Sequence, residues 1–185
     1  MEQGFQSLYN TVKSILSNKV IATYFLFYPI FIFEIFAFME PIIQLNFVAI
    51  GLATLAMFFL GFLWYTPLFG KIWAKEMGFS REMEVPKGFL IRSLILNLIG
   101  NFLLAFVLSH NILAWDARSW GHAGNFIDQG QAAVMSAFFT WLGFYVPQDL
   151  GAVTWQMKSW KLFFINTSYH LIGLLIVSFI LVYMH

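Results

Sequence analysis

Five long apolar segments constrain this sequence more than any other feature. They cover residues 20–39, 46–65, 89–109, 130–146 and 162–183. An α-helix needs roughly 20 residues to cross a bilayer, and only the fourth segment is clearly shorter. Phe126 and Ile127 are available to extend it. Because backbone groups in hydrocarbon must be hydrogen-bonded within their own segment, the sequence predicts an all-α integral membrane bundle with five transmembrane helices.

The composition agrees with a membrane chain and excludes several kinds of chemistry. Of the 185 residues, 60% are hydrophobic and 10% are charged, whereas a soluble domain typically has about 25% charged residues. A net charge of +1 gives no reason to expect nucleic-acid binding. The absence of Cys excludes disulfides, thiol catalysis and Cys-ligated metal sites.

The first part of the chain differs from the rest. Residues 1–19 place apolar side chains at helical spacing, which predicts an amphipathic helix on the membrane surface. The 20–39 segment is rich in Phe and poor in small residues, so we expect a peripheral transmembrane helix. The other four segments carry stripes of small and polar residues and are expected to pack together. The predicted domains are therefore 1–45 and a four-helix transmembrane domain over 46–185.

Charge asymmetry predicts the orientation of the chain. If all five segments span, nine of the ten Lys and Arg residues lie on one side and only Arg118 lies on the other. Positive residues collect on the cytoplasmic side. We therefore expect a cytoplasmic N-terminus and a C-terminus on the opposite side.

Polar side chains at similar depth form the sharpest candidate site. Counting helical rise from the predicted inner surface places most of this group near the midplane, with Asn166 shallower. The carboxylic acid of Glu34 has three interpretations: a proton or cation site, a protonated acid that joins the first helix to the bundle, or a group that faces another subunit. The two Asn residues form either an interhelical hydrogen-bond ladder or a polar permeation path. The candidate cluster is Glu34, Asn97, Asn101, Asn166 and His170.

His170 beside Asn166 has two interpretations. It can serve as a proton relay or as an axial ligand of haem or chlorophyll, or it can be a buried His hydrogen-bonded to Asn. A b-type haem usually needs two opposed His, and the other three lie at a different depth. The sequence therefore predicts no cofactor apart from bound lipid.

Residues at the predicted inner surface suggest an interfacial anchor. Aromatic rings there can enter the interface while the Lys side chains reach lipid phosphates. Arg92 and Asp149 are expected to form a structural ion pair at the same level. The outer-loop residues His110, Asp116, His122 and Asp128 match no metal-ligand spacing, so no metal site is predicted. The predicted anchor residues are Trp64, Tyr65, Lys71, Trp73, Lys75, Trp160 and Lys161.

Several motifs resemble a known family. The stretch Gly61-Phe62-Leu63-Trp64-Tyr65 leads to Pro67, and Phe69-Gly70-Lys71, Trp141-Leu142-Gly143-Phe144 and Trp160-Lys161-Leu162-Phe163 follow in order. From about residue 46 to the C-terminus the chain resembles domain of unknown function 1761 (DUF1761), a family of small, mostly bacterial four-helix membrane proteins. The resemblance implies a membrane bundle in a bacterial inner membrane and supplies no activity.

These observations favour a non-enzymatic protein. The sequence shows no nucleophile–base arrangement, no Gly-rich phosphate loop, no paired carboxylates and no internal repeat. We therefore predict an accessory or structural subunit of an oligomeric membrane assembly, with membrane lipids and other membrane subunits or further copies of the chain as partners. The alternative is a small transporter or channel that uses the midplane cluster.

Overall fold

The structure, a computed structural model, describes residues 41–79, 85–124 and 127–185. Every helical segment within these ranges belongs to a unit that spans residues 42–185. The predicted surface helix, the predicted first span and Glu34 lie outside the described residues. The account below therefore concerns the 42–185 unit alone.

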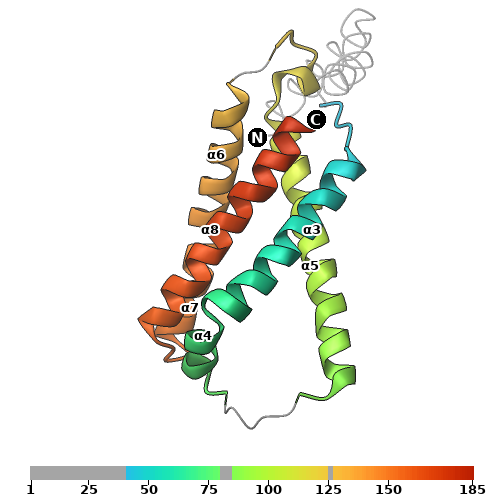
Figure 1. Cartoon of the computed structure of the whole chain (residues 1–185). Coiled ribbons are helices and arrows are strands. Elements are labelled where there is room, and N and C mark those ends of the chain that lie inside the picture. Colours follow the sequence, from blue (N-terminus) through green and yellow to red (C-terminus); the bar gives the residue numbers. More distant parts are fainter. Residues whose placement is uncertain (1–40, 80–84, 125–126) are drawn as a thin grey trace, which may run out of the picture. The chain divides into compact units, whose positions relative to one another are not determined.

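The described residues form helices and no strands (Figure 1). Two of the segments, η1 and η3, are π-helical, and η2 is a 3₁₀ turn. In chain order the elements are α3 (Phe47–Leu63), η1 (Trp64–Leu68), α4 (Gly70–Met77), α5 (Lys87–Ala114), η2 (Ala117–Trp120), α6 (Gln129–Thr140), η3 (Trp141–Tyr145), α7 (Val146–Thr154) and α8 (Trp160–Tyr183).

Three of the helical segments are long and apolar enough to cross a membrane: Phe47–Leu68, Lys87–Ala114 and Trp160–Tyr183. They coincide with the second, third and fifth predicted spans, and they are compatible with a membrane protein. The predicted fourth span over 130–146 is divided between α6, which has 12 residues, and η3. A π-helical segment therefore interrupts the fourth span.

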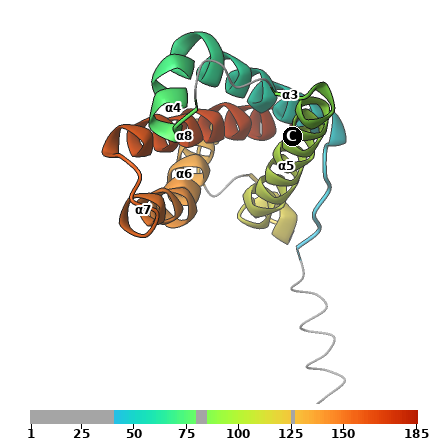
Figure 2. The ribbon, with the colours of Figure 1, turned by 90° about the horizontal axis from the view of Figure 1, so that it is seen from below.

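Helix α8 is the centre of the unit. It packs against α3 and α6 along their lengths and also against the short helices α4 and α7 (Figure 2). Small residues make this close approach possible, as predicted. Ala53 on α3, Ala133 and Ala137 on α6 and Ala105 on α5 are all fully buried. In the absence of a hydrophobic drive within lipid, such small residues allow helices to associate by close packing.

Local sequence explains where several helices begin and end. The Asn46 side chain accepts hydrogen bonds from the N–H groups of Val48 and Ala49 at the start of α3. Ser159 caps α8 by accepting from the Leu162 N–H. Gly78 ends α4 with a positive φ of 82°, a left-handed conformation that glycine adopts without a steric penalty.

The order of elements occurs twice. A long helix, a π segment, a short helix and a second long helix follow one another in α3–η1–α4–α5 and again in α6–η3–α7–α8. Both π segments overlap the pattern Tyr-x-Pro, at residues 65–67 and 145–147. This shared pattern is too short to be recognised as an internal repeat in the sequence. The repeated arrangement is therefore apparent only in the structure.

Candidate functional site

The two π segments contain much of the family motif. A proline cannot donate a backbone hydrogen bond, and its ring collides with the carbonyl four residues earlier in an α-helix. Pro67 lies inside η1, and Pro147 follows η3. The wider π turn is closed in η1 by the Phe69 N–H, which donates to the Trp64 carbonyl at 2.9 Å. Single π turns inside helices are frequent at functional sites.

Each π segment begins with a tryptophan that binds the backbone of α8. Trp64 Nε1 donates to the carbonyl oxygen of Ile165 at 3.0 Å. Trp141 Nε1 donates to the carbonyl oxygen of Thr167 at 2.8 Å and to its Oγ1 at 3.0 Å. The two indoles therefore hold the same turn of α8 from η1 and from η3.

Tyrosine rings extend this contact along α8. The Tyr65 ring lies 5.0 Å from the Tyr169 ring, and the Tyr145 ring lies 4.3 Å from the His170 ring, measured between centroids. The Tyr65 hydroxyl donates to Asn166 Oδ1 at 3.2 Å. We name the set Trp64, Tyr65, Trp141, Tyr145, Tyr169, Asn166, His170 and Asp149 the α8 cluster.

The α8 cluster contains one ion-pair geometry. His170 Nδ1 lies 3.1 Å from Asp149 Oδ2, and Asp149 is 7% exposed. This contact holds the imidazole ring against Tyr145. Among the described residues, no three His, Asp or Glu side chains are grouped to hold a metal ion.

The structure gives Asp149 a partner different from the predicted one. Asp149 is paired with His170. Among the described residues, Arg92 forms no ion pair with Asp149. The physical reason is the packing of the elements. Helix α7 packs on α8, whereas Arg92 lies exposed in the first half of α5.

The predicted midplane cluster is divided into two groups. On α5, Asn101 Nδ2 donates to Asn97 Oδ1 at 3.1 Å, with Asn101 buried and Asn97 exposed. On α8, Asn166 and His170 belong to the α8 cluster. The described members therefore do not form one site.

The predicted interfacial anchor is also divided. Trp64 is 8% exposed, and Tyr65 is half-buried against α8, so both rings pack inside the bundle. Trp73 packs its ring 5.4 Å from that of Tyr65. The exposed members are Lys71, Lys75, Trp160 and Lys161.

Sequence reasoning missed Trp141, Tyr145 and the role of Asp149. Trp141 stands in the motif that carried the family resemblance, and the Tyr-x-Pro pattern shared by residues 65–67 and 145–147 was a usable signal. The pairing of Asp149 with His170 had no such signal, since it depends on how α7 lies on α8.

A second polar group lies in the loop that follows α5. Arg118 donates from Nη2 to Asp116 Oδ2 at 2.6 Å and from Nε to both carboxylate oxygens. The hydrogen bond from Arg118 lowers the pKa of the Asp116 carboxyl below its ordinary value. The same hydrogen bond raises the pKa of the Arg118 guanidinium.

Comparison with known proteins assigns the chain to a family. A family model described as "Protein of unknown function (DUF1761)" matches residues 48–182. Searches of curated proteins and of solved structures find no match. The matched residues include both π segments and all of the α8 cluster. The chain therefore belongs to the DUF1761 family.

Proposed function

We propose that this chain is a non-enzymatic subunit of a larger membrane assembly, and that the first half of α5 is the surface through which it associates. The observation that carries the proposal is the exposure of Asn97. From residue 87 to residue 100, every residue except half-buried Ser93 is exposed. Asn97 lies in the middle of this apolar stretch.

Exposing the Asn97 amide to lipid is energetically unfavourable. Among the described residues its hydrogen-bond partner is Asn101, which donates to Asn97 Oδ1. The Asn97 N–H groups have no acceptor among those residues. Transfer of an amide into an apolar medium without a hydrogen bond costs on the order of 2–7 kcal/mol. A helix from another subunit that supplies an acceptor would remove that cost.

The α8 cluster supports a structural role more than a catalytic one. Its two indoles and the Tyr65 hydroxyl donate within the bundle, to the backbone of α8 and to Asn166. The nearby hydroxyl of Ser168 donates to the Phe164 carbonyl. The indole and Tyr65 contacts hold other elements to α8, the Ser168 contact lies within α8, and none of them places a nucleophile beside a base.

Cysteine cross-linking tests the proposal, because the chain contains no native Cys. Ser93→Cys places a thiol on the stripe of Asn97, one turn earlier. Ile95→Cys is the matched control, since it lies at similar depth on the opposite side of α5. Oxidation in native membranes is expected to cross-link Ser93→Cys to a second copy, and a bifunctional thiol reagent would detect a different subunit. The proposal is rejected if Ser93→Cys gives no more adduct than Ile95→Cys.

The alternative is a small transporter or channel, and the His170–Asp149 pair favours it. In that alternative, the half-buried imidazole and the buried carboxylate that holds it would form the proton-coupling site. Proteoliposomes with an internal pH indicator test it. Proton-coupled flux that disappears in Asp149→Asn and persists in Asp116→Asn would support transport. Absence of flux across a range of ion and solute gradients would leave the subunit proposal in place.

A further inference from the structure

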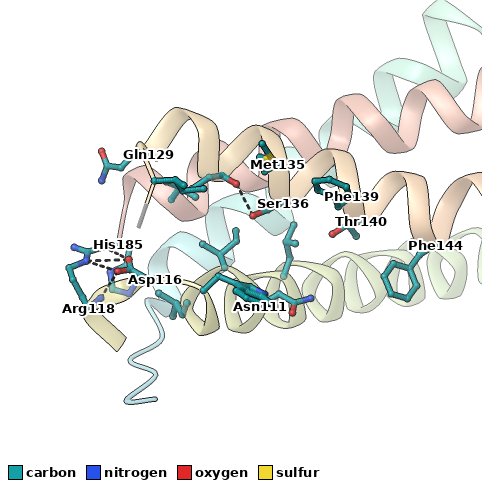
Figure 3. A pocket seen from close by; sticks show the side chains of 17 residues that line it. Asn111, Asp116, Arg118, Gln129, Met135, Ser136, Phe139, Thr140, Phe144 and His185 are labelled. Carbon is teal, nitrogen blue, oxygen red and sulfur yellow. Dashed lines mark hydrogen bonds and ion pairs between the residues drawn. The ribbon is translucent and has the colours of Figure 1, made fainter. Parts of the chain in front are cut away.

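A cavity between α5 and α6 lies apart from the α8 cluster. Its volume is about 550 Å³, within the range of about 300–1,000 Å³ that is typical of small-molecule sites. Side chains from α5, η2, α6, η3 and the end of α8 line it (Figure 3). We name it the α5–α6 cavity.

The α5–α6 cavity changes from polar to apolar along its length. Asp116, Arg118 and His185 lie together at one end, and Phe144 lies at the other (Figure 3). The hydroxyl of Ser136, in between, already donates to the Ala132 carbonyl at 2.7 Å. The cavity therefore offers charge at one end and, beyond it, a mostly apolar wall that also includes Asn111 and Thr140, which is broadly the polarity of an amphiphile.

The length of the α5–α6 cavity matches an acyl chain. From Gln129 to Phe144 the path along α6 and η3 is about 22 Å, at about 1.5 Å per residue. One leaflet contributes about 15 Å to a hydrocarbon core of about 30 Å. A chain that enters at the polar end has room to extend fully along the cavity, with its headgroup beyond the core.

The charges at the polar end are complementary to a zwitterionic headgroup. Arg118 uses Nε and Nη2 on Asp116, and its remaining N–H groups have no partner among the described residues. These can donate to a phosphate oxygen. The Asp116 carboxylate can accept from a primary ammonium group two carbons further along the headgroup.

We propose that the α5–α6 cavity binds one acyl chain of a phosphoethanolamine phospholipid, with the phosphate at Arg118 and the ammonium at Asp116. A choline headgroup has the same net charge but no N–H to donate, so it loses the contact with Asp116. A glycerol headgroup keeps the phosphate contact and brings no positive charge to Asp116. This proposal requires that the chain lies in a membrane. It does not depend on the assembly proposed above.

Native mass spectrometry of the full-length, delipidated protein in mild detergent tests the proposal. The protein is titrated with dioleoyl phosphatidylethanolamine, phosphatidylcholine and phosphatidylglycerol in separate arms. We expect the ethanolamine lipid to bind about tenfold more tightly than the other two, as one charge-assisted hydrogen bond predicts. Because binding is read on the monomer peak, the result is independent of assembly.

Variants locate the site. Ser136→Phe fills the α5–α6 cavity and is expected to reduce ethanolamine-lipid binding about tenfold or more. Val134→Phe is the control, because Val134 is exposed on α6 and does not line the cavity. Met135→Trp is a second filling variant should Ser136→Phe unfold.

Asp116→Asn is expected to abolish the preference for ethanolamine over glycerol. Equal binding of all three lipids, or unchanged binding in both filling variants, would overturn the proposal.

Discussion

Gly70 occupies a position where no side chain fits. A Cβ at residue 70 would lie 2.6 Å from the backbone oxygen of Tyr65 and 3.1 Å from its carbonyl carbon. Both atoms are backbone, so neither can move without distorting η1. This explains why a glycine stands at the junction between the π segment and α4.

Gly70→Ala is therefore expected to lower the free energy of unfolding by about 1–3 kcal/mol, the usual cost of forcing a methyl group into a packed site. Thermal unfolding in detergent, followed by circular dichroism, measures this. Gly51→Ala is the control, because a Cβ there meets no atom within 4 Å. Because residue 51 lies in a helix interior, Gly51→Ala is expected to raise the free energy of unfolding by up to about 1 kcal/mol. Equal effects of the two changes would refute the steric explanation.

The side chains of Asp149 and His170 are expected to be energetically coupled. A double-mutant cycle with Asp149→Ala and His170→Ala should give an interaction energy of about 0.5–3 kcal/mol, since the side chains touch and are largely buried. The matched cycle of Asp149→Ala with Arg92→Ala should give a value near zero. Chemical unfolding in micelles measures both. Larger coupling to Arg92 would restore the pairing predicted from sequence.

The Asp116–Arg118 pair should make a small, pH-dependent contribution to stability. The pKa of Asp116 is lowered in the folded chain, so the contribution is complete above the ordinary carboxyl value of about 3.8 and is lost as pH falls through the lower folded value. The pair is partly exposed, so less than about 1 kcal/mol is at stake. Melting curves from pH 5 to pH 2 compare the natural chain with Asp116→Asn. A difference that grows toward low pH would contradict this assignment.

At the scale of elements, α8 depends on the two indoles that bind it. Trp64→Phe and Trp141→Phe each remove a hydrogen bond to an α8 carbonyl while keeping an aromatic ring. Each change should lower the free energy of unfolding by about 0.5–1.5 kcal/mol. Trp155→Phe is the control, since Trp155 is 88% exposed. If all three variants unfold alike, the indole hydrogen bonds contribute nothing to stability.

Sequence reasoning succeeded for elements whose signal is local. The apolar runs that became α3, α5 and α8 were visible from length and composition. The π segments were not visible. Both segments are apolar on nearly every side, so the phase shift that one additional residue causes leaves no visible break in the pattern. The start of η1 and all of η3 therefore looked like ordinary parts of the second and fourth spans.

At the scale of the whole molecule, the residues that were misplaced are those whose partners are distant in sequence. Depth along a helix put His170 and Asn97 at one level, but depth does not say which sides of α5 and α8 face each other. Asn166 instead meets Tyr65, and His170 meets Asp149. The family resemblance was confirmed over residues 48–182, and it carried no information about these contacts.

The 42–185 unit should fold without the residues that precede it. Its core is built from its own helices, and the family match begins at residue 48. We expect a chain that starts at Ile42 to keep its helical circular dichroism per residue and to melt within a few degrees of the full chain. Size-exclusion chromatography in detergent provides the check for aggregation. Loss of cooperative melting would show that residues 1–41 are needed for the fold.

The π segment η3 also controls the angular phase of everything that follows it. A single residue turns an α-helix by about 100°. The wider π turn accommodates one extra residue, so the residues after it keep nearly the orientation that a regular α-helix with one residue fewer would give them. Removing one residue from 141–145 would therefore leave Asp149 facing His170, whereas inserting one residue between η3 and Asp149 would rotate that side chain by about 100° away from it. In this stretch, the position at which a residue is gained or lost decides whether the pairing survives.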